Sequence, residues 1–449
     1  MTFTESTQYV LKEATIETTG GPISIINLIE EINFYDNLFL PVSSGCVIIT
    51  DTANLLKELA LNVDVLKFHV EKILDNEAMN FQKAFVIYSI TDRKNLNNTS
   101  EVYVLNFVSA EYLFSQQKIT NTGFSGKYSD LVKKILSQDL KVSNEKMKNI
   151  EETNRVVQVT VPNITPFDAV EWCSKRAISS RDLPEFLFFS NREGYNFVSL
   201  SNLMAKDTIL KINFSPKNLE EDDQWAELSK ARGLEVEKQR DIVDRINSGV
   251  DSGVVLGFNP LMGTFGSKPV NGQDVYNKGI HANKGSDFFT LVNPDSTTNQ
   301  TNYNSKQVLT ANYLEGIIKS KYVKENDPTL ASKTERFEDV LLQRGQIISK
   351  LMEKRIKVVM PGNFQLTSGV TVDLDAPGFS IREKGQDPNQ DVTLSGKYII
   401  VATRHVLGLK RFVTIIELAT DSTKDTRKIS TSSRQIDAMK TYDRIRGVR

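Results

Sequence analysis

The sequence predicts an α+β protein that is mostly β, with two similar β-barrel-like domains, an α/β domain and a loop-rich insertion. Three observations lead to this prediction. Strand-like runs with a period of two crowd both ends of the chain, at 47–108 and 358–419. A helical pattern followed by a hairpin pattern fills residues 165–200. A polar stretch rich in Gly, Asn, Ser, Thr and Asp runs from about 250 to 334.

The first β domain is expected over residues 1–118. Its strand-like runs are 47–50, 63–70, 84–90 and 102–108, and Asp51 is a candidate cap for a short helix that carries Leu55, Leu56 and Leu59. Alternation of apolar residues along these runs predicts a core. The residues expected there are Leu66, Phe68, Val86, Tyr88, Leu105 and Phe107.

The α/β domain is expected over residues 119–206. A helix should begin at Pro166, because Thr165 is a good N-cap and Asp168 completes a capping box. The runs EFLFFS and YNFVSL then form a hairpin around a four-residue turn. Cys173 raises the question of catalysis, but no histidine lies in this segment, so the cysteine is interpreted as a buried apolar residue.

The second β domain is expected from two segments, 207–250 and 346–421, with the insertion domain at 251–345 ending in a helix. The run KYIIVATRHVL pairs plausibly with FVTIIELAT. This plan of strand, connection and strand repeats that of AFVIYSITDR and EVYVLNFVSAEYL in the first β domain. The alternative is that two unrelated hairpins share the period of two.

Composition describes an ordinary globular chain of 449 residues, with 39% hydrophobic and 25% charged residues. The net charge of −1 argues against a protein that gains its affinity by neutralising phosphates. The N-terminus lacks a signal-peptide pattern, and no run of 18 apolar residues occurs, so synthesis in a cytoplasm without membrane insertion is expected. Two cysteines form neither a disulfide framework nor a zinc site by count.

Short catalytic and nucleotide-binding motifs are absent from the sequence. His69, His281 and His405 do not have metal-ligand spacing, and the acidic run at 220–223 is typical of a solvated segment. We therefore expect no catalytic residues, no metal and no cofactor, and hence no enzyme.

The C-terminal tail, 422–449, is basic, with eight Lys or Arg residues against three aspartates. It is either a solvated tail or an arm that docks on an acidic neighbouring subunit. The candidate partner-docking residues are Lys424, Arg427, Lys428, Arg434, Lys440, Arg444, Arg446 and Arg449.

An ordered set of segments resembles the central baseplate hub proteins of T-even-type contractile-tailed bacteriophages. The set comprises FLPVSSGCVIITDTANLL, the helix and hairpin described above, RGQIISKLMEKRIKVVMPGNFQLTSGVTVDL and the hairpin that starts at KYIIVATRHVL. It covers about residues 23–421 and is weakest over 215–335.

The resemblance implies a homotrimer in which two β domains per chain form a pseudo-hexameric ring at the centre of the tail baseplate of a virion. Such a ring adapts the sixfold tail tube to the threefold central spike. The implied partners are the spike protein below and tube or tube-initiator and tape-measure proteins above, with DNA only in transit. Neutral net charge fits a passage through which DNA slides.

Two other functions remain open from the sequence. A tail-tip cell-wall hydrolase would need paired carboxylates or a metal site, and neither pattern is found. A carbohydrate-binding adhesin would use the insertion, where NPDSTTNQTNYNSK supplies hydrogen-bonding groups but few aromatic platforms.

Overall fold

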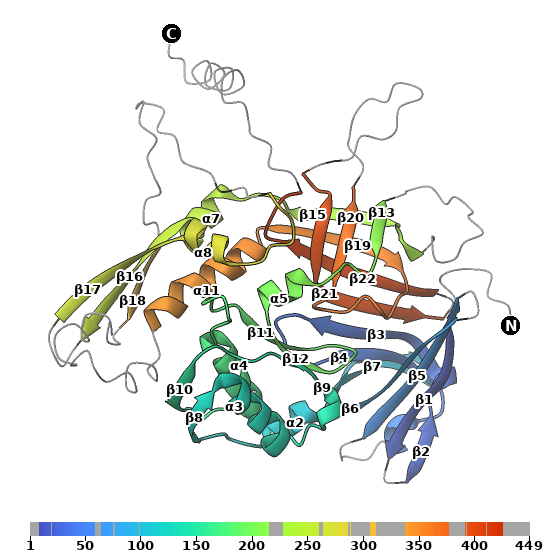
Figure 1. Ribbon diagram of the computed structural model, residues 1–449. Coiled ribbons are helices and arrows are strands. Elements are labelled where there is room, and N and C mark those ends of the chain that lie inside the picture. The colour runs from blue at the N-terminus through green and yellow to red at the C-terminus, as the bar shows by residue number, and fades with distance from the viewer. Residues whose placement is uncertain are drawn as a thin grey trace, which may run out of the picture.

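The computed structural model of the protein is mostly β, with several sheets and a smaller helical part (Figure 1). It describes residues 9–18, 20–58, 64–74, 77–97, 99–214, 228–259, 264–285, 288, 306–310, 337–376, 391, 393–409 and 411–424. The largest sheet has 14 strands and is built from both ends of the chain. Within the described residues, none of the helices is long and apolar enough to cross a membrane.

The N-terminal β unit contains seven antiparallel strands in the order β3-β4-β7-β6-β5-β1-β2. Its strands are β1 Val10–Thr18, β2 Gly21–Ser24, β3 Ile29–Asn37, β4 Ser44–Asp51, β5 Val65–Leu74, β6 Glu77–Asn97 and β7 Ser100–Val108. A 3-10 turn, Ile26–Leu28, and the short helix α1, Leu55–Glu58, connect them.

The predicted core of this unit is confirmed with one exception. Leu66, Phe68, Leu105 and Phe107 are fully buried, and Val86 is 4% exposed. Tyr88, however, is 56% exposed, because a β-bulge in β6 between Ile87 and Ser89 interrupts the alternation there.

The expected cap at Asp51 is also wrong. Asp51 is the last residue of β4, and its Oδ1 accepts a hydrogen bond from the amide of Ala53 at 2.8 Å. The helix begins only at Leu55, four residues later, which is too far for a side-chain cap.

The α/β domain packs four helices against two small sheets. Its elements are α2 Ala110–Gln116, β8 Gly123–Lys127, α3 Tyr128–Lys134, a π-helical turn Ile135–Asp139, a 3-10 turn Asn144–Lys146, β9 Met147–Ile150, β10 Val156–Thr160, α4 Pro166–Arg176, β11 Phe186–Ser190, β12 Tyr195–Ser199 and α5 Leu200–Ala205. The predicted N-cap at Thr165 is confirmed, since its Oγ1 accepts from the amide of Asp168. The Asp168 carboxylate accepts from the Thr165 hydroxyl at 2.7 Å and not from the Thr165 amide that a capping box would use.

The C-terminal β unit also has seven strands, in the order β15-β19-β22-β21-β20-β13-β14. These are β13 Lys211–Phe214, β14 Lys230–Ala231, β15 Gly233–Lys238, β19 Lys354–Pro361, β20 Thr371–Asp375, β21 Gly396–Gly408 and β22 Arg411–Thr420. Helix α7, Ile242–Ser248, follows β15, and α11, Phe337–Leu351, precedes β19 where the sequence predicts a helix.

The insertion is more regular than the loop-rich segment that the sequence predicts. Strands β16 Ser252–Asn259, β17 Thr264–Asn271 and β18 Lys306–Thr310 form a separate sheet. Helix α8, Gly272–Lys278, begins directly after β17. Val255, Val270 and Val275 pack with Leu342 of α11 in a small core. The polar composition hid these apolar residues, which gain a core by contact with α11 and with Leu183 of the α/β domain.

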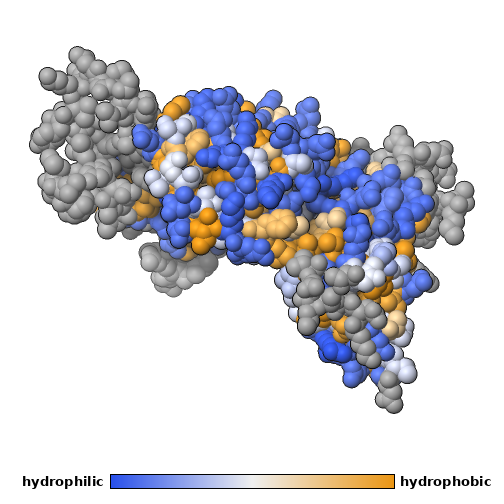
Figure 2. Space-filling model, turned by 90° about the horizontal axis from the view of Figure 1, so that it is seen from below, coloured by the Kyte–Doolittle hydropathy of each residue, from blue (hydrophilic) through white to orange (hydrophobic). Residues whose placement is uncertain are grey.

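The two β-barrel-like domains that the sequence predicts are not observed among the described residues. In the described residues the sheets are open, because β3, the edge strand of the N-terminal unit, pairs with β21 of the C-terminal unit. The blue and the orange-red strands of Figure 1 therefore belong to one continuous sheet. The surface seen from below carries hydrophobic patches among hydrophilic areas (Figure 2).

We predict that Phe68→Ala lowers the free energy of unfolding by about 3–5 kcal/mol, because Phe68 is fully buried and packs against Phe34 and Phe107. Urea denaturation measures this loss. The neighbouring variant Lys67→Ala, whose amine pairs with Glu17 at the surface, should leave it almost unchanged, because solvent screens such an exposed pair. Equal losses in the two variants would contradict the assigned core.

Candidate assembly site

The two β units share one strand order. When the strands of each unit are numbered along the chain, both sheets run third, fourth, seventh, sixth, fifth, first, second. In both units the third, fourth, seventh, sixth and fifth strands, which are neighbours in that order, pair antiparallel. The first two strands differ, since β13 and β14 pair parallel and β1 and β2 pair antiparallel. This order supports the predicted duplication.

The register of the two units agrees as well as their order. The sixth strands, β6 and β21, each carry a bulge, at Tyr88 and at Val401. In each unit the fifth strand stops pairing two residues before that bulge, at Val86 and at Ile399. Two sheets with unrelated histories have no physical reason to share this detail, so the units are equivalent in structure.

The site that joins the two units is the pairing of β3 with β21. Seven antiparallel residue pairs run from Glu31 opposite Gly408 to Asn37 opposite Ala402. They occupy the part of β21 beyond the bulge, where β20 no longer covers its edge. The amide of Leu38 extends the joint with a 2.7 Å hydrogen bond to the carbonyl of the bulge residue Val401.

Polar side chains reinforce this joint. Arg404 Nε donates to Asn33 Oδ1 at 2.8 Å, and its guanidinium lies 3.6 Å from the Glu31 carboxylate. Tyr9 donates to the carbonyl of Gly408 at 2.7 Å. The buried amine of Lys72 donates to the carbonyl of Gly362, which joins β5 to the C-terminal unit a second time.

An aromatic cluster crosses the joint. Phe81 of β6 stacks on Phe364 of the C-terminal unit, with ring centroids 4.7 Å apart and planes 10° apart. Phe364 in turn contacts Phe412, at 4.5 Å, and His405, at 5.1 Å. The core of the N-terminal unit thus includes side chains from the C-terminal unit, so the two units form one folded body.

His405 lies inside this joint, in β21 opposite Phe34 of β3. Its side chain is 4% exposed, and its Nδ1 lies 3.0 Å from Thr414 Oγ1. Burial, with a smaller contribution from the positive charge of Arg192, lowers the pKa of His405 to about 3. The imidazole is therefore neutral in the folded protein near neutral pH.

The α/β domain is clamped to both β units by the turn of its hairpin. Asn191 donates from Nδ2 to the carbonyl of Ser368, and its own carbonyl accepts from the buried amine of Lys83 in β6, both at 3.3 Å. Arg344 of α11 donates to three carbonyls of the α/β domain, those of Ser174, Pro184 and Phe186. These contacts fix the domain beside the joint.

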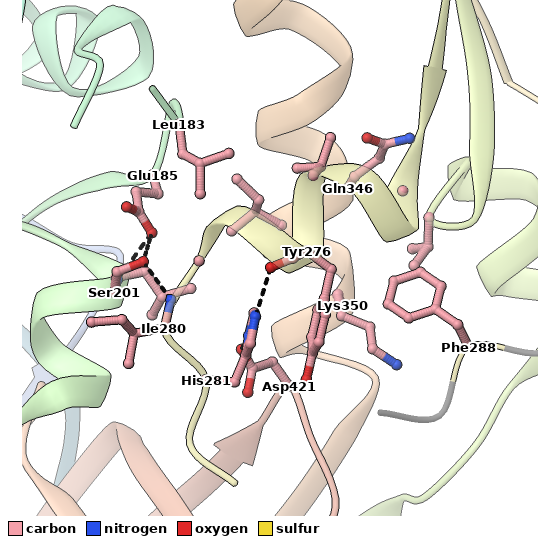
Figure 3. Close-up of a pocket in the computed structure, with 16 residues that line it drawn as sticks. Leu183, Glu185, Ser201, Tyr276, Ile280, His281, Phe288, Gln346, Lys350 and Asp421 are labelled. Carbon is pink, nitrogen blue, oxygen red and sulfur yellow. Dashed lines mark hydrogen bonds and ion pairs between the residues drawn. The ribbon is translucent and has the colours of Figure 1, made fainter. Parts of the chain in front are cut away.

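A small cavity lies where the α/β domain, the insertion, α11 and the end of β22 meet (Figure 3). Ser201 links its walls, because its hydroxyl donates to Glu185 at 2.6 Å and accepts from the amide of Ile280 at 3.1 Å. His281 Nδ1 lies 2.8 Å from the Asp421 carboxylate. The cavity measures about 30 Å³, which is room for water but not for an organic substrate.

A buried ionic network ties α7, the insertion and α11 together behind this cavity. Arg245, 3% exposed, contacts Asp251 at 2.5 Å and Glu353 at 3.1 Å. Lys350 contacts the other oxygen of Glu353 at 2.8 Å. The charges compensate one another, so the network has a structural explanation and does not need a bound ion.

The residues that the sequence singled out stand as follows. Of the eight basic tail residues, the structure describes only Lys424, which is exposed; the other seven lie outside the described residues, as do 220–223. Cys173 is fully buried in the core of the α/β domain, where burial raises the pKa of its thiol well above its usual value. Within the described part of the chain, no group of three or more His, Cys, Asp or Glu side chains is placed to hold a metal.

The joint itself was not singled out from the sequence. Its strands were recognised as strands, but strand pairing between residues almost 400 positions apart has no local pattern. The sequence predicted only the repeated plan of strand, connection and strand. The structure aligns AFVIYSIT with KYIIVATR and adds the bulges at Tyr88 and Val401, which were not predicted.

Comparison with known proteins gives the fold but no family. No protein-family model matches the chain, and neither does any curated protein. Among solved structures, a tail protein from Neisseria meningitidis is similar at 9% identity, with 92% of this chain and 97% of that chain covered and a TM-score of 0.50. The chain shares the fold of that tail protein along most of its length.

Two weaker similarities were found. The 43 kDa tail protein of prophage MuSo2 from Shewanella oneidensis has 8% identity, coverage of 92% of this chain and 98% of that chain, and a TM-score of 0.49. A type VI secretion system component from E. coli has 8% identity, coverage of 92% and 76%, and a TM-score of 0.40.

Replacing His405 by Gln should remove a specific acid sensitivity. The unfolded chain takes up a proton at this residue below pH 6.5, whereas the folded protein does so only near pH 3. The stability that neutral His405 provides is complete above pH 6.5 and falls by up to about 1.4 kcal/mol per pH unit below it. The unfolding free energy of the wild type should therefore drop relative to that of His405→Gln by about 2 kcal/mol between pH 7 and pH 5, as measured with urea. A difference that does not change with pH would contradict this.

Cys173→Ser should fold and assemble like the wild type, with a loss of about 1–3 kcal/mol in unfolding free energy, because it places a hydroxyl in an apolar core. Cys173→Ala serves as the control without the hydroxyl. Urea denaturation and the solution mass measure the two effects. Loss of function in either variant with normal folding would overturn the scaffold interpretation.

Proposed function

We propose that the protein is the structural baseplate hub of a contractile phage tail, a homotrimer whose six β units form a pseudo-sixfold ring. The ring adapts the sixfold tail tube above to the threefold spike below. It encloses the passage for the tape-measure protein and DNA, and the protein does not act as an enzyme. Its place is the centre of the tail baseplate in the virion, after synthesis in the host cytoplasm.

One observation carries this proposal, namely the equivalence of the two β units in strand order and register. Three copies of a chain with two equivalent units present six similar positions around one axis. A sixfold tube can then contact each position in the same way, while the rest of the chain retains threefold symmetry for the spike. The shared fold with a tail protein supports the same assignment.

The remaining features of the site agree with a mechanical role. Both units are held rigidly in one chain by the backbone pairing of β3 with β21 and by the aromatic cluster across it. The cavity between the α/β domain, the insertion and α11 is water-sized, and two pairs of its polar side chains, Ser201 with Glu185 and His281 with Asp421, contact each other. The basic tail remains a candidate arm for docking on an acidic neighbour.

The two alternative functions have simple tests. Clearing of a cell-wall suspension by the purified protein would favour a tail-tip hydrolase. Binding on a glycan array would favour a carbohydrate-binding adhesin. The polar run of the insertion, residues 293–305, lies outside the described residues.

The trimer is tested by light scattering of the purified protein, alone and with the spike protein of the same particle. The expected mass is three times the 50.6 kDa of the chain, and the spike should add to it in a ratio of three chains to three. A mass of one chain under both conditions, at concentrations up to about 100 µM, would contradict the proposal, since stable oligomers form well below that range.

A further inference from the structure

We infer that β15 of one chain pairs with the outer half of β6 of a second copy, in the way that β3 pairs with β21 inside one chain. This inference rests on the proposed trimer and names the contact that would hold it together. It follows from the equivalence of the two units. Within one chain the third strand of the N-terminal unit, β3, pairs with the sixth strand of the C-terminal unit, β21. The third strand of the C-terminal unit, β15, and the sixth strand of the N-terminal unit, β6, keep the equivalent edges open within the described residues.

The outer half of β6 is the first of these open edges. Strand β5 covers β6 only up to Val86, and within the described residues β6 beyond Ile87 pairs only with β7. The equivalent part of β21 is the part that β3 covers. In β6 this segment leaves large apolar side chains in solvent, with Tyr88 56%, Ile90 43% and Leu96 61% exposed. The equivalent of Tyr88 in the other unit is Val401, which is 4% exposed.

Strand β15 is the second open edge. It is the third strand of its unit, equivalent to β3, and in the part of the chain that the structure describes it pairs with β19 alone. Val236 lies on this strand with 37% of its surface exposed. An edge strand with unpaired backbone groups and an exposed apolar residue is a template for another strand.

The internal joint also gives the register of the contact. Asn33 lies opposite Val406 in the joint. The equivalent of Asn33 in the C-terminal unit is Glu235, because Glu235 faces β19 at Lys357 as Asn33 faces β4 at Cys46. The equivalent of Val406 in the N-terminal unit is Lys94, because Lys94 faces β7 at Val102 as Val406 faces β22 at Val413. Glu235 of one copy is therefore placed opposite Lys94 of the next.

Charge supports this pairing. Glu235 of β15 and Lys94 of the outer half of β6, which this register places opposite each other, both have exposed side chains. Their neighbours Glu237 and Arg93 already contact Arg355 at 3.8 Å and Glu101 at 2.7 Å within the chain, so the charge argument rests on Glu235 and Lys94. Oppositely charged residues directly across an antiparallel pair stabilise it, and like charges would oppose it. A second copy of this chain thus supplies an edge of the right length, polarity and charge for each open edge.

The contact is head-to-tail, because the two edges differ. Each chain offers one β15 and one β6, so the contacts either continue as a filament or close into a ring. If each step between neighbouring units, within and between chains, is a rotation of one sixth of a turn, then six units from three chains close the ring without a leftover edge.

Cysteine cross-linking tests the contact directly. In a Cys46→Ser, Cys173→Ser background, the pair Lys94→Cys and Glu235→Cys should form disulfides between chains, giving dimers and closed trimers on non-reducing gels. The pair Asn33→Cys and Val406→Cys is the matched positive control, because the same pairing within one chain should give a disulfide-bonded monomer. Lys94→Cys with Glu145→Cys, an exposed residue of the α/β domain, should give neither product.

Charge reversal tests the register without a covalent bond. Lys94→Glu and Glu235→Lys should each raise the concentration at which the trimer dissociates by about tenfold, and the double reversal should restore it. Both side chains are exposed in the single chain, so the variants should keep the wild-type unfolding free energy.

The outcomes separate this inference from the proposed function. A trimer by light scattering with no cross-link at 94 and 235, while the 33 and 406 control bridges, would overturn the contact and leave the hub assignment standing. If the double variant with Lys94→Glu and Glu235→Lys does not recover the wild-type dissociation concentration of the trimer, the register is wrong. A protein that stays monomeric would contradict the trimer itself.

Discussion

The structure depends on one constraint, which is that the backbone groups along a strand edge need hydrogen-bonding partners. Strand β21 has 13 residues and its neighbour β20 has 5, so beyond the Val401 bulge the edge of β21 that faces away from β22 has no partner within its own unit. Strand β3 supplies that partner. Because β3 is thereby used, the N-terminal unit stays open, and the two units become one sheet.

Other features follow from this pairing. It brings Phe34 next to His405 and sets Phe364 against Phe81, so the cores of the two units merge. Merging buries His405 among aromatic rings and fixes its neutral form. The hairpin turn of the α/β domain then fits over the junction, where Asn191 contacts both units. A change in the angle between the units would have to break all of these contacts together, which makes the pair rigid.

Local features of the fold could be predicted from the sequence, whereas long-range features could not. The N-cap at Thr165, helix α11 and most strands follow from residue type and spacing, which act within a few residues. Tyr88 was misplaced because a single extra residue at a bulge shifts every later side chain to the other face. The insertion was misjudged because its apolar residues gain burial from Leu183 and from α11, both of which are more than 60 positions away. The joint depends on partners almost 400 residues apart, and nothing local specifies them.

The differences between the equivalent strands are as informative as their likeness. Beyond the bulge, β21 reads ATRHVLG, in which Leu407 is fully buried and the one charged residue, Arg404, contacts Glu31 and Asn33 of β3. The equivalent part of β6 reads SITDRKNLN, with three exposed charged residues and a second irregularity where Asp92 has a φ of +54°. A joint formed during folding of one chain can be apolar, since it is never exposed in the folded protein. An edge that waits for another chain must stay soluble until it is paired, which requires charge and a twisted backbone. The inferred contact between chains accounts for the charged side chains of β6 where the equivalent part of β21 is mostly apolar.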